Sequence, residues 1–140
     1  MSEQIHITIP GVPQSKARPR FATKNNRVFA YTNERTASYE SFIKLTYQQH
    51  YRGKQPLTGA LCANITAYFP IPKSATKKAH ESMLAGETQH TKKPDCDNIA
   101  KICLDALNGI AYHDDSQVIK LKVEKLYSDE PRAEIILKEL

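Results

Sequence analysis

The amino-acid sequence predicts an α/β fold of the α+β type, a single small domain whose mixed, mostly antiparallel sheet is packed by two main helices. Apolar residues alternate along several short segments, as strands require, and recur at three- and four-residue spacing along two others, as helices require. The 140 residues suffice for one hydrophobic core, and neither a repeat nor a composition break divides them. Residues 1–140 are therefore expected to form one domain.

The N-terminal half is expected to hold two strands and one helix. Residues 5–9 alternate with period two and are ended by the following Pro-Gly, which predicts a strand. Residues 11–35 are polar, basic and rich in loop residues, with a short strand or hairpin arm at 27–31. Residues 36–51 carry apolar side chains with helical spacing, which predicts an amphipathic helix. Its apolar face comprises Tyr39, Phe42, Ile43, Thr46 and Tyr47.

The C-terminal half is expected to add a central strand, a helix and a hairpin. Residues 59–69 alternate as a half-buried strand does. Residues 73–93 are polar and basic and predict a surface segment containing a short helix. A second helix is predicted over 97–108, with Gly109 at its C-terminal end. Residues 118–127 and 133–140 predict two strands joined as an antiparallel hairpin. The buried stripe of the second helix comprises Ile99, Ile102, Cys103, Ala106 and Leu107.

Composition excludes several classes of protein. With 40% hydrophobic and 25% charged residues, the chain is globular rather than disordered. No run approaches the roughly 20 apolar residues of a membrane span, and the N-terminus lacks the pattern of a signal peptide. The three cysteines, an odd number without a CxxC pair, argue against a disulfide framework or a structural zinc site. We expect a cytoplasmic protein with no membrane partner.

Basic residues are concentrated in two segments of a chain with net charge +5 and pI near 9.1. No acidic residue occurs between positions 4 and 33. This pattern predicts contacts with DNA phosphates, although a basic run can also be a solvated face. The aromatic residues Phe21, Phe29 and Tyr31 either stack on bases or belong to the core. The predicted DNA-binding residues are Lys16, Arg18, Arg20, Lys24, Arg27, Lys92 and Lys93.

Acidic residues are gathered elsewhere: five of the six aspartates fall between Asp95 and Asp115. Asp95 and Asp97 stand at the predicted helix start, where aspartate commonly caps the backbone. The helix advances about 16 Å, and the six residues that follow it can return about 20 Å. The chain can therefore bring Asp114 and Asp115 back beside the first pair. Such a carboxylate cluster needs a proton or a cation and favours Mg²⁺, Mn²⁺ or Ca²⁺ over zinc.

Lys101 lies on the same face of the predicted helix as Asp97 and Asp105. It either makes weak ion pairs one turn along the helix or supplies a cation that stabilises charge on a phosphate.

The segment KKPDCDNIAKICLDALNGIAYHDDSQV (92–118) resembles the core signature of the RusA family of Holliday junction resolvases, small endodeoxyribonucleases common in prophages. Residues 15–21 and 31–40 are similar to the N-terminal half of the family more loosely. Residues 52–90 match it only in general character.

The resemblance implies roles for individual residues. Asp95, Asp97 and Asp115 would be the metal-binding catalytic carboxylates, with Asp114 a further candidate ligand, and Lys101 would be the catalytic lysine. The expected cofactor is Mg²⁺, with Mn²⁺ as a substitute. The expected assembly is an intertwined homodimer that nicks opposed strands of four-way junction DNA in recombination and repair. An isologous dimer would supply the two matched cuts that a two-fold symmetric junction needs.

Two other functions remain open at this point. The chain can be a DNA- or junction-binding protein without catalysis, with its aspartates serving as helix caps. It can also be a nuclease that acts on flaps, replication forks or RNA.

Overall fold

The protein is built on a four-stranded sheet of order β1-β6-β4-β5. The computed structural model describes residues 3–16, 20–31 and 34–140. β6 pairs antiparallel with both β1 and β4, whereas β4 and β5 are parallel. The predicted mixed, mostly antiparallel sheet of a small α+β domain is confirmed. The strands of the sheet are β1 (Gln4–Pro10), β4 (Leu61–Pro70), β5 (Val118–Ser128) and β6 (Arg132–Glu139).

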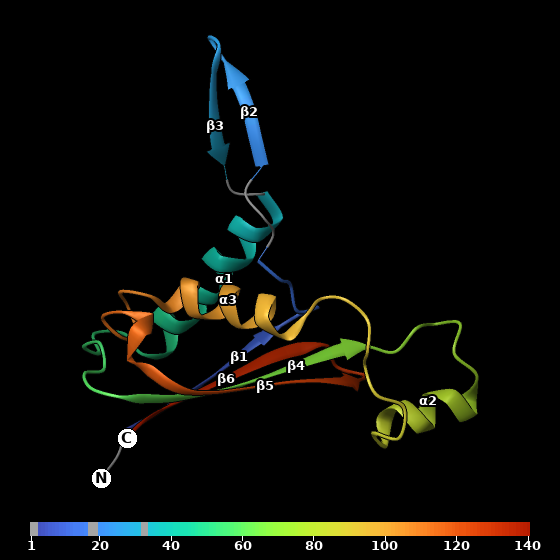
Figure 1. The fold of residues 1–140 in the computed structure, drawn as a ribbon. Coiled ribbons are helices and arrows are strands. Elements are labelled where there is room, and N and C mark those ends of the chain that lie inside the picture. The colour runs from blue at the N-terminus through green and yellow to red at the C-terminus, as the bar shows by residue number, and fades with distance from the viewer. Residues whose placement is uncertain (1–2, 17–19, 32–33) are drawn as a thin grey trace.

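Two helices cover one face of this sheet (Figure 1). α1 (Glu34–His50) packs on β1 and on α3 (Cys96–Leu107), and α3 also contacts β5. A shorter helix, α2 (Lys77–Leu84), lies beyond the sheet and contacts β5. Within the part of the chain that is described, no helix has the length and apolarity to cross a membrane.

The core lies between the sheet and the two long helices. The inward residues of β1 are Ile5, Ile7 and Ile9, and each is at most 2% exposed. Every second residue of β4 is likewise buried, from Leu61 to Phe69. Full burial of one such aliphatic side chain contributes roughly 1.5–3 kcal/mol. The predicted stripe of α3 is buried in full, which fixes the opposite, polar face of α3 toward solvent.

The buried face of α1 differs from the prediction at one residue. Tyr39, Ile43, Thr46 and Tyr47 are buried as expected, but Phe42 is 41% exposed. At 100° per residue, Phe42 lies at the margin of the arc that faces the core.

The prediction that β5 and β6 pair as a hairpin is wrong. β5 and β6 are consecutive in sequence, but β4 lies between them in the sheet. The reason is burial. β4 is apolar on its inward face along its whole length and takes the central position, whereas the lysine-rich β5 tolerates an edge. Residues 129–131 therefore carry the chain past the end of β4.

A separate two-stranded hairpin projects from the body of the domain (Figure 1). It consists of β2 (Arg20–Lys24) and β3 (Arg27–Tyr31), paired antiparallel. The sequence predicts a short strand or hairpin arm at 27–31, where β3 lies, but places residues 20–24, which form β2, in a loop-rich segment. The turn between the strands is Asn25-Asn26, and both residues have positive φ, as a two-residue hairpin turn requires.

Candidate active site at the N-terminal end of α3

Asp95 occupies the N-cap position of α3, yet its carboxylate makes no capping hydrogen bond. Only its backbone carbonyl joins the helix, by accepting a hydrogen bond from Ile99 N at 3.1 Å. A capping aspartate normally satisfies one of the free N–H groups at the helix start. The exposed Asp95 side chain is therefore available to a ligand, and helix capping does not account for it.

Asp97 lies in the first turn of α3, beside a polar hollow of about 670 Å³. One of its carboxylate oxygens, Oδ1, accepts a hydrogen bond from Asn98 N at 3.0 Å. The hollow is bounded by the connection after β1, which includes Lys16, and by the segment that enters α3, which includes Lys93 and Asp95. Two carboxylates and two lysines thus line the same polar hollow.

The entrance to α3 is held against β5. Lys125 Nζ donates hydrogen bonds to the carbonyls of Lys92 (2.6 Å) and Pro94 (3.0 Å). Cys96 Sγ lies 3.9 Å from the carbonyl oxygen of Val123. These contacts position Asp95 and Asp97 relative to the edge strand.

Asp114 and Asp115 belong to a different turn, which precedes β5. Asp114 caps the short 3₁₀ helix η1 (Asp115–Gln117) by accepting a hydrogen bond from Ser116 N at 3.0 Å. The side-chain and backbone hydrogen bonds of Ser116 keep the pKa of Asp114 below its usual value. Asp114 therefore has a structural role in this turn, and Asp115 is the member of the pair whose carboxylate has no hydrogen-bond or ion-pair partner among the described residues.

Gln117 ties this turn to the body of the domain. Its Oε1 accepts hydrogen bonds from the backbone N–H groups of His113 (2.8 Å) and Asp114 (2.9 Å). Its Nε2 donates to the carbonyls of Leu57 (3.0 Å) and Gly59 (2.9 Å). The position of Asp115 is thereby fixed relative to the start of β4.

The two acidic pairs do not meet within one chain. Asp95 stands at the first turn of α3, whereas the 111–117 segment lies at its last turn (Figure 1). A helix of 12 residues is about 18 Å long, so roughly that distance separates the two ends. The β5 contacts agree, because Cys96 lies beside Val123 rather than beside Val118, where β5 begins. The return of Asp115 to the start of α3, which the loop length permits, is not what the chain does.

Lys101 lies on the solvent-facing side of α3, within an ion network. Its Nζ is 3.3 Å from Asp105 Oδ2, the i,i+4 pair expected from the helix. The same Asp105 oxygen is 3.4 Å from Lys16 Nζ, and Lys16 also donates a hydrogen bond to Glu40 of α1. Burial alone would lower the pKa of Lys16, but Glu40 and Asp105 outweigh it and raise the pKa above its usual value. The four charges alternate in sign from α1 to Lys101.

Comparison with known proteins identifies the family. The family model Endodeoxyribonuclease RusA matches residues 10–138. This chain belongs to the RusA family. It is also 38% identical over 138 residues to the Uncharacterized protein YqaN of Bacillus subtilis (strain 168), a match that covers 97% of this chain and 96% of that protein. The family match therefore covers the acidic residues from Asp95 to Asp115, the ion network of Lys16, Glu40, Asp105 and Lys101, and the projecting hairpin.

The start of α3 carries donors suited to a hard cation. Asp95 and Asp97 present carboxylate oxygens to one hollow, and carboxylates are the ligands that Mg²⁺ prefers. Across residues 3–16, 20–31 and 34–140, however, no three His, Cys, Asp or Glu side chains come together as a metal site. The donor chemistry at the start of α3 fits Mg²⁺, and the described residues of one chain bring two carboxylates together there.

The predicted DNA-binding residues of this RusA-family chain are dispersed. Lys24 and Arg27 are exposed and face each other across the tip of the hairpin. Lys92 and Lys93 are exposed at the entrance to α3. Arg18 lies outside the described residues, as do the side chains of Arg20, Phe29 and Tyr31. Lys16 is engaged in the ion network, and its contact with DNA stays a prediction.

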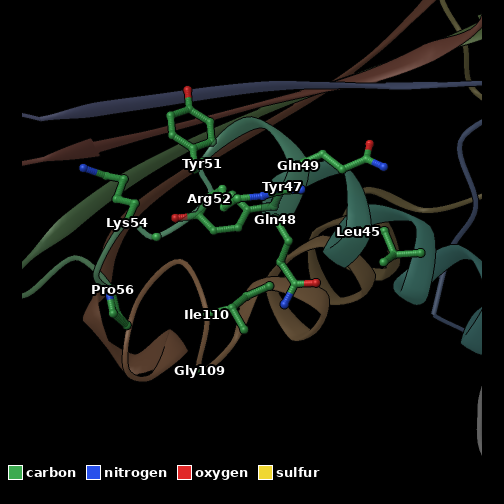
Figure 2. Close-up of a pocket in the computed structure, with 11 residues that line it drawn as sticks. Leu45, Tyr47, Gln48, Gln49, Tyr51, Arg52, Lys54, Pro56, Gly109 and Ile110 are labelled. Carbon is green, nitrogen blue, oxygen red and sulfur yellow. The ribbon is translucent and has the colours of Figure 1, made fainter.

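A second hollow, of about 640 Å³, lies at the C-terminal end of α1 (Figure 2). Tyr47, Arg52 and Ile110 are among the residues that line it, and none of the predicted catalytic residues does. Because no carboxylate lines this hollow, the predicted metal site is not placed there.

Two residues with structural importance at the site were not singled out from the sequence. They are Gln117 and Lys125. The ion pair of Lys101 with Asp105 was one of the two interpretations of Lys101, whereas the pairing of Asp105 with Lys16 was not predicted. Gln117 and Lys125 act through backbone carbonyls far away in the sequence, and such contacts leave no local pattern.

Proposed function

We propose that this protein is a Mg²⁺-dependent, structure-selective endodeoxyribonuclease that resolves Holliday junctions by paired, symmetric nicks. The observation that carries the proposal is the Asp95 carboxylate, which stands at a helix N-cap without capping it and faces a polar hollow together with Asp97. Family membership over residues 10–138 supports the nuclease chemistry. The reaction would serve DNA recombination and repair in the cytoplasm.

Asp95, Asp97 and Asp115 would hold the metal ion. Bound there, Mg²⁺ supplies a Lewis acid for the scissile phosphate and a more acidic water. The positive end of the α3 dipole lies at the same place and favours the negative charge of a phosphate.

Lys101 would stabilise charge on the phosphate during cleavage. Its side chain is 61% exposed and extends from α3 one turn after Asp97, so it can reach a strand laid along the helix. Lys92 and Lys93, at the entrance to the same helix, would hold the flanking phosphates.

A second copy of the chain would complete the site. One chain carries Asp95 and Asp115 at opposite ends of α3, and an isologous dimer can place one end beside the other end of its partner. The exposed apolar residues support an interface: Phe42 and Leu45 on α1, and Phe21 and Val28 on the hairpin, are between 41% and 71% exposed. A free two-stranded hairpin is marginally stable, which also favours burial against a partner.

The test is cleavage of a synthetic four-way junction with Mg²⁺, with EDTA as the control. We expect paired nicks that disappear with EDTA, and loss of nicking in Asp97→Asn by about 10²-fold or more while junction binding is retained. Undiminished nicking by Asp97→Asn would overturn the assignment. Junction binding without any cut product would show a non-catalytic binding protein instead, and preferential cutting of flaps, forks or RNA would show a different nuclease.

A further inference from the structure

Lys16 lies between α1 and α3, and it is tied to α3 at two points. Its backbone N–H donates to the carbonyl of Asn98 at 3.1 Å, one residue after Asp97. Its Nζ lies 3.4 Å from Asp105 Oδ2, two turns further along the helix. The segment before the hairpin is therefore fastened to α3 near both ends of the helix.

The four side chains of the ion network differ in solvent exposure. The side chains of Lys16, Glu40 and Asp105 are 22%, 23% and 23% exposed, whereas that of Lys101 is 61% exposed. The half-buried part has two carboxylates and one ammonium, a net charge of −1, and Lys101 balances it from the solvent side. In a partly desolvated setting such charges interact more strongly than surface ions do.

Asp105 is shared by two lysines through the same oxygen. Each ammonium competes for Oδ2, at 3.3 Å from Lys101 and 3.4 Å from Lys16. Without Lys16, Asp105 and Glu40 would leave a net charge of −2 beside Lys101. Lys101 would then be drawn onto Asp105 and away from the solvent side, where a phosphate can be reached.

We propose that Lys16 is a positioning residue that, as the internal counter-ion of Asp105 and Glu40, keeps Lys101 available to the DNA phosphate, and that it is not itself a phosphate contact. This inference rests on the proposed function for the role of Lys101. It replaces the simplest interpretation of a basic N-terminal segment, in which every lysine binds DNA directly.

The first experiment compares Lys16→Met with Lys24→Met, which removes an exposed hairpin lysine, and with Lys44→Met, which removes an exposed α1 lysine that has no ion pair among the described residues. Each phosphate contact contributes about 0.9 to the slope of log affinity against log salt concentration. We expect Lys24→Met to lower the slope by about that amount, and Lys16→Met to leave the slope unchanged while lowering kcat for junction nicking roughly tenfold. Lys44→Met should change neither.

The second variant supplies a rescue. In Lys16→Met/Asp105→Asn the carboxylate that would capture Lys101 is also neutral, so we expect kcat to recover to within about threefold of wild type. Lys16→Arg should retain most of the activity, because it keeps the charge. Circular dichroism and thermal unfolding establish that each variant is folded.

A measurement without DNA separates this inference from the nuclease assignment. Acylation of lysines by an N-hydroxysuccinimide ester, followed by peptide mass spectrometry, reports how free the Lys101 amine is. We expect Lys101 to react about threefold more slowly in Lys16→Met and at the wild-type rate in the double variant. If the wild-type protein cuts no junction but this pattern is seen, the nuclease assignment fails and the counter-ion role stands. A lowered salt slope in Lys16→Met, or unchanged Lys101 reactivity, overturns the inference.

Discussion

Asp95 and Asp115 lie at opposite ends of α3, separated by a helix of 12 residues. Both are aspartates of the segment that defines the family resemblance, and both are predicted metal ligands. A site that uses both carboxylates therefore requires a second copy of the chain. This single relationship connects the predicted metal site to the predicted homodimer.

Complementation between two inactive variants tests that connection. We expect Asp95→Asn and Asp115→Asn each to abolish nicking. When the two are mixed after unfolding and refolding together, a mixed dimer recovers one intact site, composed of Asp95 from one copy and Asp115 from the other. Random pairing makes half of the dimers mixed, so about one quarter of the wild-type sites should return.

The cleavage products of the co-refolded variants also test whether the two copies share a site. Each mixed dimer has one working site, so it should give single nicks in place of the paired cuts that resolve a junction. Sites formed within one chain would each carry one substitution, and the mixture would then stay as inactive as its components.

Removal of metal should end catalysis without unfolding the protein. Asp95, Asp97 and Asp114 are exposed and Asp115 is half-buried. The carboxylates of Asp95 and Asp97 also lie at the positive end of the α3 dipole, which stabilises their charge without a metal ion. A cation bound to the native state stabilises it only by mass action, by about 1.4 kcal/mol at tenfold excess over Kd. Thermal unfolding of the EDTA-treated protein should therefore remain cooperative, with a midpoint a few degrees lower at most. Loss of the folded state in EDTA would indicate a structural metal.

Gln117 should contribute measurably to stability, because its side chain makes four hydrogen bonds with backbone groups. Gln117→Glu keeps the acceptor oxygen but turns a carboxylate toward the carbonyls of Leu57 and Gly59. We expect a loss of about 1–3 kcal/mol in the free energy of unfolding, measured by urea denaturation. His113→Ala is the matched control in the same turn, since the His113 side chain is exposed and makes no hydrogen bond or ion pair with the described residues. Equal stability of the two variants would contradict the structural role of Gln117.

Lys16 should give stability a dependence on alkaline pH. Glu40 and Asp105 outweigh the effect of burial and raise the pKa of Lys16 in the folded state. A raised pKa means that the folded state holds the proton more tightly than the unfolded state. The contribution is therefore complete below the usual lysine value of 10.5 and is lost as the pH rises through the folded-state pKa.

The difference in unfolding free energy between wild type and Lys16→Met isolates this effect from the other lysines and tyrosines. We expect the difference to shrink as the pH is raised from 9 to 11, followed by urea denaturation at each pH. A difference that stays constant over that range would show that Lys16 contributes through packing of its aliphatic stem alone.

The regular elements with strong periodicity were predicted well from the sequence. The stripe of Ile99, Ile102, Cys103, Ala106 and Leu107 is buried as its spacing indicates, and the alternation of β4 identifies its inward face. These patterns are local, because each residue's environment follows from helical or strand geometry alone. Where the local signal is weak the prediction failed: Phe42 was placed in the buried face of α1 but is exposed, and β2 was not predicted as a strand.

Two other features, the order of the strands and the distance between Asp95 and Asp115, could not be predicted from local periodicity. The adjacency of β5 and β6 in sequence favoured a hairpin, but the wholly apolar inward face of β4 takes the position between them. The loop after α3 is long enough to return to Asp95, but Gln117 anchors it to Leu57 and Gly59 instead. Chain length bounds where a residue can go, and long-range hydrogen bonds decide where it lies.

The sequence by itself determined the α+β class, the family, the core face of α3 and, apart from Phe42, the core face of α1. Only the tertiary structure decided that the side chain of the N-cap residue Asp95 makes no capping hydrogen bond, that Lys16 pairs with Glu40 and Asp105, and that Asp95 and Asp115 are a helix length apart. The physical reason is that periodicity and composition record the local environment of a residue. Contacts among the β1–β2 connection, α1, α3 and the start of β4 arise only when the sheet and helices pack together.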